Sequence, residues 1–300
     1  MVVVNQTIRS YADAAEFVRA CETEFENRLD EIVHSIVYDC HPECITLSGP
    51  TCAGKTTTAN KLTAEIAASG KKAVVLSIDD FFHERMEEKL VDGNVDFDSV
   101  AAIDLDMFAA CVADIMEERP TVLPRFDFIT GRRKTPVPYT HNADDIILFE
   151  GIQAVYPEVV SLLRPYPYKS IFISVCDDIT VNGTFFSKHE VRLARRLVRD
   201  YRFRSASPEF TLDIWKNVRA NEEANIFPYM NGCDFIVNSL LKFELFMLGQ
   251  FAIPLLETVT ADSAHYETAV NLKNKLLSLR GNDIDPRHLS EHSLYREFLG

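Results

Sequence analysis

The chain has 300 residues and a formal net charge of −14, with 47% hydrophobic and 25% charged residues. This size fits one large domain with additions or two small domains, and it allows a core large enough to need no disulfide staples. A chain this acidic is a poor general binder of nucleic acid or anionic membranes, so neither is expected as a partner, and any bound anion needs locally concentrated positive charge.

The seven cysteines are odd in number and form no CxxC pair, which argues against a disulfide framework and favours a reducing, cytoplasmic location. Residues 1–10 have no basic stretch before their short apolar run and therefore do not resemble a signal peptide. No stretch approaches the ~18 uninterrupted apolar residues of a membrane span. Cys40, His41 and Cys44 lack a fourth ligand at a suitable spacing, so a zinc site is not expected.

Residues 7–40 are predicted to form a helix, because their apolar residues recur with a period near 3.6. We interpret residues 1–40 as an N-terminal helical extension that precedes a main domain over residues 41–300. This helix is expected either to pack against the main domain or to provide a contact in a homo-oligomer.

After residue 41, short apolar strands alternate with amphipathic helices. The predicted strands cover residues 44–47, 73–78, 145–149, 170–175 and 235–237. The predicted helices include residues 56–68, about 104–118 with Asp104 as the cap, and a basic helix at about 189–203. Residues 121–128 are predicted to be extended, and residues 131–139 to form a hairpin or loop. The alternation predicts an α/β fold with a parallel sheet and helices on both faces.

Chemically useful residues lie at the ends of the predicted strands. Gly49, Asp79 and Glu150 each follow or end a strand, and Asp98 lies in a loop beyond the second one. Ligands of parallel α/β folds bind beyond the carboxyl ends of the strands. The functional site is therefore expected at this edge of the sheet.

The segment after the first predicted strand matches the phosphate-binding pattern GxxxxGK[ST]. Its residues are Gly49, Pro50, Thr51, Cys52, Ala53, Gly54, Lys55 and Thr56, and Thr57 follows them. The glycines let backbone N–H groups turn toward phosphate oxygens, Lys55 reaches the β- and γ-phosphates, and the Thr56 hydroxyl holds Mg²⁺. The alternative is an ordinary glycine loop. Cys52 is interpreted as a tolerated small residue rather than a redox switch.

Three carboxylates could take part in the chemistry of such a loop. Glu150 ends an apolar run, which is the position expected for an acid that binds Mg²⁺ or its water shell. The alternative is that Glu150 is simply an exposed acid at the end of a strand. Asp79 and Asp80 follow a strand, where one of them could take a proton from an attacking hydroxyl, or both could cap the segment after residue 81. The guanine-reading NKxD and the DxxG pattern are both absent, which argues against a GTPase switch protein.

Six arginines are concentrated within and just after the basic helix. They are Arg192, Arg195, Arg196, Arg199, Arg202 and Arg204. In an acidic protein this concentration indicates a lid, over about residues 185–210, that neutralises a transferring phosphate. The alternatives are a solvated face that pairs with surface acids and a nucleic-acid patch, which fits poorly with the overall charge.

Together these motifs resemble the uridine/cytidine kinases of the phosphoribulokinase–uridine kinase group of P-loop kinases. The matching segments, in order, are 49–56, 78–82, 97–98, 124–128 with Arg133, 149–152 and 192–200. Residues 215–222, 225–228, 238–240 and 293–300 resemble a bacterial-type uridine kinase-like branch, without the TGS module that often precedes its members. The resemblance extends from about residue 40 to residue 300.

The resemblance implies a P-loop NTPase fold, ATP as the phosphate donor, Mg²⁺ as the cofactor and a nucleoside as the hydroxyl acceptor. Asp79 would be the base at the 5′-hydroxyl, with Lys55 and Arg196 also catalytic, and Asp98 would hold the ribose hydroxyls. Thr56, Glu150 and Asp79 would organise the metal. The phosphate loop with Thr57, Arg199 and Arg204 would bind ATP. The remaining substrate contacts would be Phe82, Phe126, Phe128, Arg133 and Arg192.

Three positions depart from the uridine/cytidine kinase pattern. Phe82 and Phe126 stand where tyrosines are usual, and Gly131 stands where a histidine is usual. An apolar pocket discriminates less strongly than one that hydrogen-bonds its ligand. Three functions are therefore kept: a nucleoside 5′-kinase, a kinase of the same group for another small acceptor such as a sugar, vitamin or coenzyme precursor, and a non-catalytic nucleotide-binding regulator.

Overall fold

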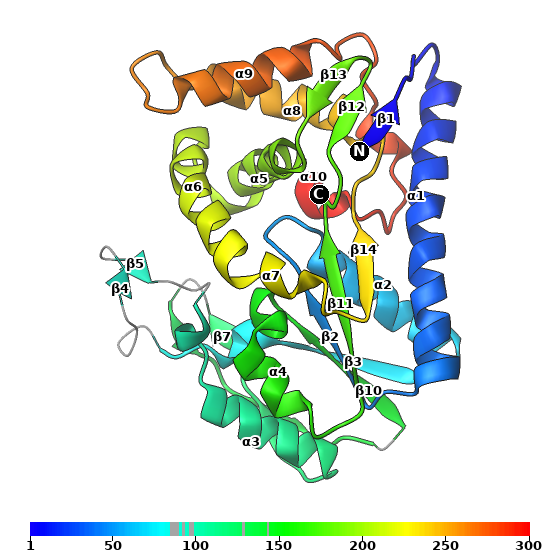
Figure 1. Cartoon of the computed structure of the whole chain (residues 1–300), viewed down its shortest axis with the longest axis vertical. Coiled ribbons are helices and arrows are strands. Elements are labelled where there is room, and N and C mark those ends of the chain that lie inside the picture. Colours follow the sequence, from blue (N-terminus) through cyan, green and yellow to red (C-terminus); the bar gives the residue numbers. More distant parts are fainter. Residues whose placement is uncertain (85–89, 92–93, 96–98, 128–129, 143) are drawn as a thin grey trace.

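The computed structural model describes residues 1–84, 90–91, 94–95, 99–127, 130–142 and 144–300 (Figure 1). Its centre is a five-stranded parallel sheet with the strand order β14-β11-β2-β10-β3. The strands are β2 (Cys44–Ser48), β3 (Lys72–Ser77), β10 (Asp145–Glu150), β11 (Tyr168–Ser174) and β14 (Phe235–Asn238). The five predicted strands are thus confirmed, and so is the parallel α/β fold.

Helices cover both faces of this sheet, as predicted. The helices are α1 (Tyr11–His34), α2 (Lys55–Ala68), α3 (Leu105–Met116), α4 (Pro157–Leu163), α5 (Lys188–Arg204), α6 (Pro208–Asn225), α7 (Phe227–Met230), α8 (Glu244–Glu257), α9 (Tyr266–Leu277) and α10 (Arg296–Leu299). In Figure 1, α3 and α4 lie at the lower end of the molecule, away from α5, α8 and α9.

The alternation of side chains along β10 shows why both faces need cover. Ile146 and Leu148 belong to one core cluster, which includes residues of α1, α2, α5 and α8. Ile147 and Phe149 belong to a second cluster, which includes residues of α3 and α4. Every residue of β10 is buried, because successive side chains of a strand point to opposite faces and both faces are packed. The apolar run in the sequence follows from this double burial.

The helix predicted over residues 7–40 is observed in two parts. The Ser10 side chain accepts a hydrogen bond from the Asp13 N–H and begins α1, and the α-helical geometry ends at His34. Residues Ser35–Cys40 continue as a π-helix, which ends at His41 with a φ of 45°. The periodicity therefore predicted the helical segment but not the change of geometry within it.

Small sheets complete the fold around the central one. β1 (Val2–Val4) pairs in parallel with β12 (Ile179–Val181), which forms a hairpin with β13 (Thr184–Phe186). The other strands form three two-stranded pairs: β4 (Leu90–Val91) with β5 (Asn94–Val95), β6 (Thr121–Leu123) with β9 (Val137–Tyr139), and β7 (Phe126–Asp127) with β8 (Arg132–Arg133). The segment predicted to be extended holds β6 and β7, but residues 131–139 form no hairpin of their own: their strands β8 and β9 pair with β7 and β6. Among the described residues, no helix combines the length and apolarity needed to cross a membrane.

Candidate active site

The loop between β2 and α2 has the backbone geometry that its two outer glycines permit. Gly54 has a φ of +93°, and a Cβ added to Gly49 would lie 2.0 Å from the carbonyl oxygen of Ile173 on β11. A Cβ on Gly54 would lie 2.6 Å from Leu294 Cδ1. The sheet and the segment before α10 therefore press on the loop closely enough to require glycine at both positions.

The first turn of α2 presents the polar residues that were predicted to bind a nucleotide. Lys55 is half-buried, and its ammonium group donates to the Pro50 carbonyl over 3.3 Å. The Thr56 side chain is exposed, whereas the Thr57 hydroxyl donates to a Glu297 carboxylate oxygen over 3.1 Å. The positive end of the α2 dipole and the loop N–H groups favour an anion at this point.

Glu150 and Asp79 lie at the same edge of the sheet. Glu150 ends β10 and is buried, and burial raises its pKa above the ordinary value; Lys55 opposes this shift and Glu297 adds to it. A Cβ added to Gly151, the next residue, would lie 3.7 Å from Asp79 Oδ1. Asp79 belongs to a single 3₁₀ turn, Ile78–Phe81, that follows β3. The structure thus brings these two carboxylates and Lys55 to one edge of the sheet, as expected from their places at the ends of predicted strands.

Asp80, the other acid predicted after β3, takes part in a local contact. It accepts hydrogen bonds from Arg125 Nη1 at 2.7 Å and from the Phe126 N–H at 2.9 Å. These bonds fasten the short strand β7 to the end of β3. Of the two adjacent acids, Asp80 therefore positions the neighbouring hairpin.

Phe82 and Phe126 form an apolar wall beside these acids. Both rings are buried and meet edge to face with centroids 5.7 Å apart. Arg133 lies next to them, where its side chain donates to the Phe82 carbonyl over 3.2 Å and to Asp104 over 2.8 Å. Burial alone would raise the pKa of Asp104, but hydrogen bonds from the Met107 N–H and Arg133 lower it below its ordinary value. The predicted contacts Asp98 and Phe128 lie outside the described residues.

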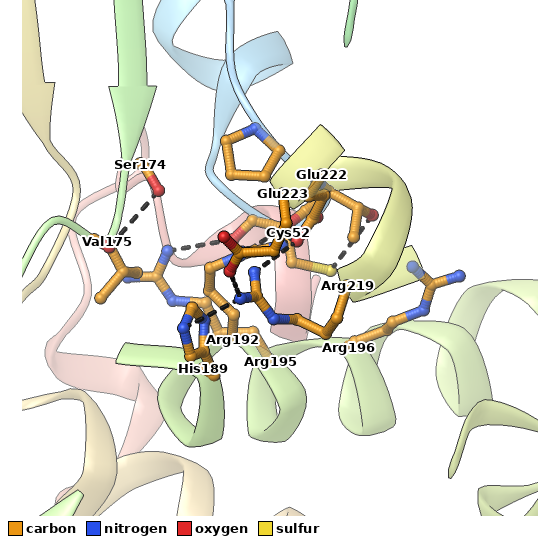
Figure 2. Close-up of polar contacts among 12 residues, drawn as sticks. Cys52, Ser174, Val175, His189, Arg192, Arg195, Arg196, Arg219, Glu222 and Glu223 are labelled. Atoms are coloured by element: carbon orange, nitrogen blue, oxygen red, sulfur yellow. Dashed lines mark hydrogen bonds and ion pairs between the residues drawn. The ribbon is translucent and has the colours of Figure 1, made fainter. Parts of the chain in front are cut away.

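Arg192 of α5 is tied to the phosphate loop and to α6. It is fully buried, and its Nε donates to the Thr51 carbonyl over 3.1 Å while its Nη2 donates to Glu222. Glu222 also accepts the Thr51 N–H over 3.3 Å and Arg219 Nη1 over 2.9 Å. Figure 2 shows Arg192 and Arg195 on α5, with Glu222 and Arg219 opposite them. Both polar groups of the Thr51 backbone are thus held by buried charged side chains.

Arg195 holds the next residue of the loop in the same way. Its Nη1 donates to the Cys52 carbonyl over 3.1 Å, and its Nε and Nη2 donate to the two oxygens of Glu244 over 2.7 and 2.9 Å. The Tyr295 hydroxyl also donates to Glu244 over 2.7 Å. Arg195 and Glu244 have no exposed side-chain surface. Such a pair is stable only when its geometry satisfies both charges, and here it does.

Three of the remaining arginines share one carboxylate, that of Asp200, whereas the Arg202 guanidinium lies 5.3 Å from the ring centroid of Phe251. Arg199 is 2.6 Å, Arg196 3.1 Å and Arg204 3.6 Å from an Asp200 oxygen. Arg196 and Arg199 are buried, whereas the Arg204 side chain is 58% exposed. The alternative of a solvated arginine face is wrong for Arg192, Arg195, Arg196 and Arg199, which are all buried. Three guanidinium groups on one acid leave a local excess of positive charge, as an anion site in an acidic protein requires.

Three acids of this region, Glu222, Glu244 and Glu297, were not singled out from the sequence as site residues, and Arg195 was assigned only to the lid. A weak signal exists for Glu244, because the apolar residues 245–248 follow it directly and a charge beside such a run is buried only with a partner; Arg296 next to Glu297 removes this signal there. Their partners lie 49 and 240 residues away, so the pairing itself had no local signal.

The chain is similar to known proteins in sequence and in structure. Residues 44–245, more than half of the chain, match the family model described as phosphoribulokinase / uridine kinase family. The chain is 28% identical to uridine-cytidine kinase 2-B of Danio rerio over 180 residues, which cover 57% of this chain and 63% of that protein. It is 26% identical to uridine kinase of Saccharomyces cerevisiae over 204 residues, which cover 66% of this chain and 37% of that protein. The matched part is therefore less than two thirds of either relative.

Among solved structures, that of the YGR205w protein is similar with a TM-score of 0.50 and 14% identity, over 73% of this chain and 94% of the other. A structure named as a possible uridine kinase from Bacillus stearothermophilus gives a TM-score of 0.43 and 21% identity, over 50% of this chain and 80% of the other. At these identities, the first likeness shows a shared fold. The family match over residues 44–245, together with the fold, shows that this chain belongs to the phosphoribulokinase / uridine kinase family.

Proposed function

We propose that the protein transfers the γ-phosphate of ATP to the 5′-hydroxyl of a nucleoside. The observation that carries this proposal is the meeting of Lys55, Glu150 and Asp79 at one edge of the sheet, beside a loop shaped to bind phosphate. Phosphoryl transfer needs little covalent chemistry from the protein, so catalysis rests on positioning and on charge.

Each group at this edge has a distinct task in the proposed reaction. The loop N–H groups and Lys55 bind the β- and γ-phosphates, and Asp79 accepts the proton of the attacking hydroxyl. Thr56 and Glu150 offer hydroxyl and carboxylate oxygens, the hard donors that suit Mg²⁺, and Asp79 is the third proposed metal contact. Mg²⁺ bound there would neutralise charge on the β- and γ-phosphates. Arg196, Arg199 and Arg204 supply further positive charge.

The acceptor side favours flat, apolar contact over hydrogen bonding. Phe82 and Phe126 present buried rings, and Arg133 already donates to Asp104 and to the Phe82 carbonyl. This observation supports a second candidate, a kinase of the same group whose acceptor is another small hydroxyl compound. Asp98 separates the two, because a ribose diol needs a carboxylate to hold it whereas a non-ribosyl acceptor tolerates Asp98→Ala.

The test is ADP release from ATP and Mg²⁺ with a panel of ribonucleosides, deoxyribonucleosides and phosphorylatable vitamins and sugars. We expect a ribonucleoside to drive release, and we expect Asp79→Asn to lower kcat at least about 100-fold, as the loss of a positioned base does. Asp106→Asn, an exposed acid in the first turn of α3, is the matched control and should leave kcat unchanged.

Other results would change the assignment. Release driven only by a non-nucleoside would favour the second candidate. Nucleotide binding without release for any acceptor, and with no difference between wild type and Asp79→Asn, would favour a non-catalytic nucleotide-binding regulator.

A further inference from the structure

The segment around α10 contacts both the start of α2 and the end of α5. It does so through every third residue, at positions 294, 297 and 300. Leu294 lies against Gly54, Glu297 accepts the Thr57 hydroxyl, and Gly300 lies against Phe203, whose ring carbon is 3.2 Å from a Cβ added to Gly300. The Glu297 N–H donates to the Leu294 carbonyl over 3.3 Å, and in such a turn residues three apart lie on the same side. One side of this segment therefore runs from the phosphate loop to the last turn of α5.

This segment is firmly fixed to the rest of the molecule. The Tyr295 hydroxyl donates to the buried Glu244, and Phe298 is buried with the Arg195 guanidinium 5.0 Å from its ring centroid. Arg296 donates from Nε to the Ser290 carbonyl over 2.8 Å. Glu297 is thus held at a defined position on a packed element.

The position of Glu297 suits the sugar of a bound nucleotide better than its phosphates. The loop and Lys55 are the proposed contacts of the terminal phosphates, and Glu297 accepts the hydroxyl of Thr57, two residues after Lys55, so Glu297 borders the proposed phosphate site. A carboxylate repels phosphate, but it accepts two hydroxyl donors at once, as the adjacent hydroxyls of a ribose provide. Beyond it, Phe203 is 54% exposed, and an exposed aromatic face can stack on any base.

We propose that the α10 segment and the last turn of α5 form the nucleoside half of the donor site, in which Glu297 accepts hydrogen bonds from the ribose hydroxyls and Phe203 stacks on the base. The inference rests on the proposed use of a nucleoside triphosphate as donor. It makes the protein selective for ribonucleotides at the donor site through a residue 240 positions from Thr57, which follows the phosphate loop.

The test is equilibrium binding of three probes that divide the donor into parts: ADP, 2′,3′-dideoxy-ADP and inorganic tripolyphosphate. Glu297→Gln should weaken ADP about tenfold, since a hydrogen bond to a charged group is lost, and should leave dideoxy-ADP and tripolyphosphate unchanged. Phe203→Leu should weaken ADP and dideoxy-ADP by at least about fivefold and leave tripolyphosphate unchanged. Glu291→Gln, an exposed acid of the neighbouring turn, should change none of the three.

The other outcomes are distinguishable. Equal tightening of all three probes by Glu297→Gln would overturn the inference, because Glu297 would then act only by repelling anions; no change for ADP would also overturn it. Wild-type protein that binds neither ADP nor tripolyphosphate would overturn both this inference and the proposed function. Ribose-dependent ADP binding without turnover would support the inference while the kinase proposal fails. Melting curves of each variant show that the binding data refer to folded protein.

Discussion

At the scale of single residues, the protein buries charges that most proteins leave at the surface. Arg192 and Arg195 have no exposed surface, and each is paired with a carboxylate that is also buried, Glu222 or Glu244. The cost of removing such charges from water is large unless hydrogen bonds satisfy them. Here the bonds extend to loop carbonyls, so the charges that stabilise the fold also fix the shape of the phosphate loop.

His189, which lies beside these buried arginines, makes the free energy of unfolding depend on pH. Burial is the largest cause that lowers its pKa to about 4; the neighbouring Arg219, Arg192 and Lys188 contribute to this shift, and Glu223 opposes it. The unfolded chain has the ordinary value near 6.5, so between these values the unfolded state binds more protons and stability rises with pH. The ring is half-buried and partly screened by solvent, so we expect roughly 1 kcal/mol of the free energy of unfolding to be lost between pH 7 and pH 4.5 from this residue.

Urea unfolding of wild type and His189→Gln across this range measures that share. Other acids also titrate there, so the relevant quantity is the difference in pH slope between the two proteins. The slope should be smaller in the variant; parallel curves would show that His189 takes up its proton equally in both states.

At the scale of elements, α5 acts as a support for the loop between β2 and α2. Its buried face places one guanidinium on the Thr51 carbonyl and another on the Cys52 carbonyl. With the carbonyls held from that side, the shape of the loop is fixed before any ligand arrives. The glycine contacts with Ile173 and Leu294 restrain the same loop at its two ends.

Removing one charge of the buried pair Arg195–Glu244 should lower the stability of the protein strongly. Glu244→Gln leaves the Arg195 charge buried without a full counterion, and we expect it to lower the free energy of unfolding by about 3–5 kcal/mol. The control is Glu24→Gln, in an exposed pair with Lys242, which should cost less than about 1 kcal/mol. Chemical denaturation measures both. Removing both charges of a buried pair costs less than leaving one of them without its partner. The double variant Arg195→Met with Glu244→Leu should therefore lose less stability than Glu244→Gln. A larger loss in the double variant would contradict this account.

The sequence predicted the elements well but not this support. Strands buried on both faces are continuous apolar runs, and the phosphate-loop motif depends on neighbouring residues, so both have local signals. The burial of Arg192 and Arg195 depends on acids on α6 and α8, 30 and 49 residues away, and an arginine-rich helix face alone is equally consistent with solvent or with a ligand. The contact of Thr57 with Glu297 is of the same kind. Burial of a charge is a property of the tertiary structure, and no local pattern encodes it.

At the scale of the whole molecule, α1 is part of the main core. Val18 and Leu29 are buried in the same cluster as the strands β2, β10 and β11, and Lys61 of α2 pairs with Glu26 over 2.7 Å. The contacts of α1 favour packing on the main domain, the first of the two roles expected for it. We propose that it unfolds together with that domain.

The variant Leu29→Ala tests whether α1 and the main domain unfold together. The cavity should lower the free energy of unfolding by about 2–5 kcal/mol. If α1 belongs to one cooperative unit, the far-UV circular dichroism and the fluorescence of Trp215, the single tryptophan, on α6, should report the same shifted transition. Arg28→Ala, at an exposed position beside it, is the control and should leave the transition in place. Loss of helix signal before any change in Trp215 would show that α1 unfolds separately.

The pairing of β1 with β12 has a consequence for how the chain is made. Val2 lies opposite Ile179, so the first strand finds its partner only after about 177 further residues have been synthesised. At ~5–20 residues per second, this interval is on the order of 10–35 s, and contacts so distant in sequence close late in folding. For much of that time the apolar face of α1 lacks β10 and β11, two of the strands that cover it in the finished fold. The nascent chain is therefore expected to depend on chaperones that shield this helix until the sheet is complete.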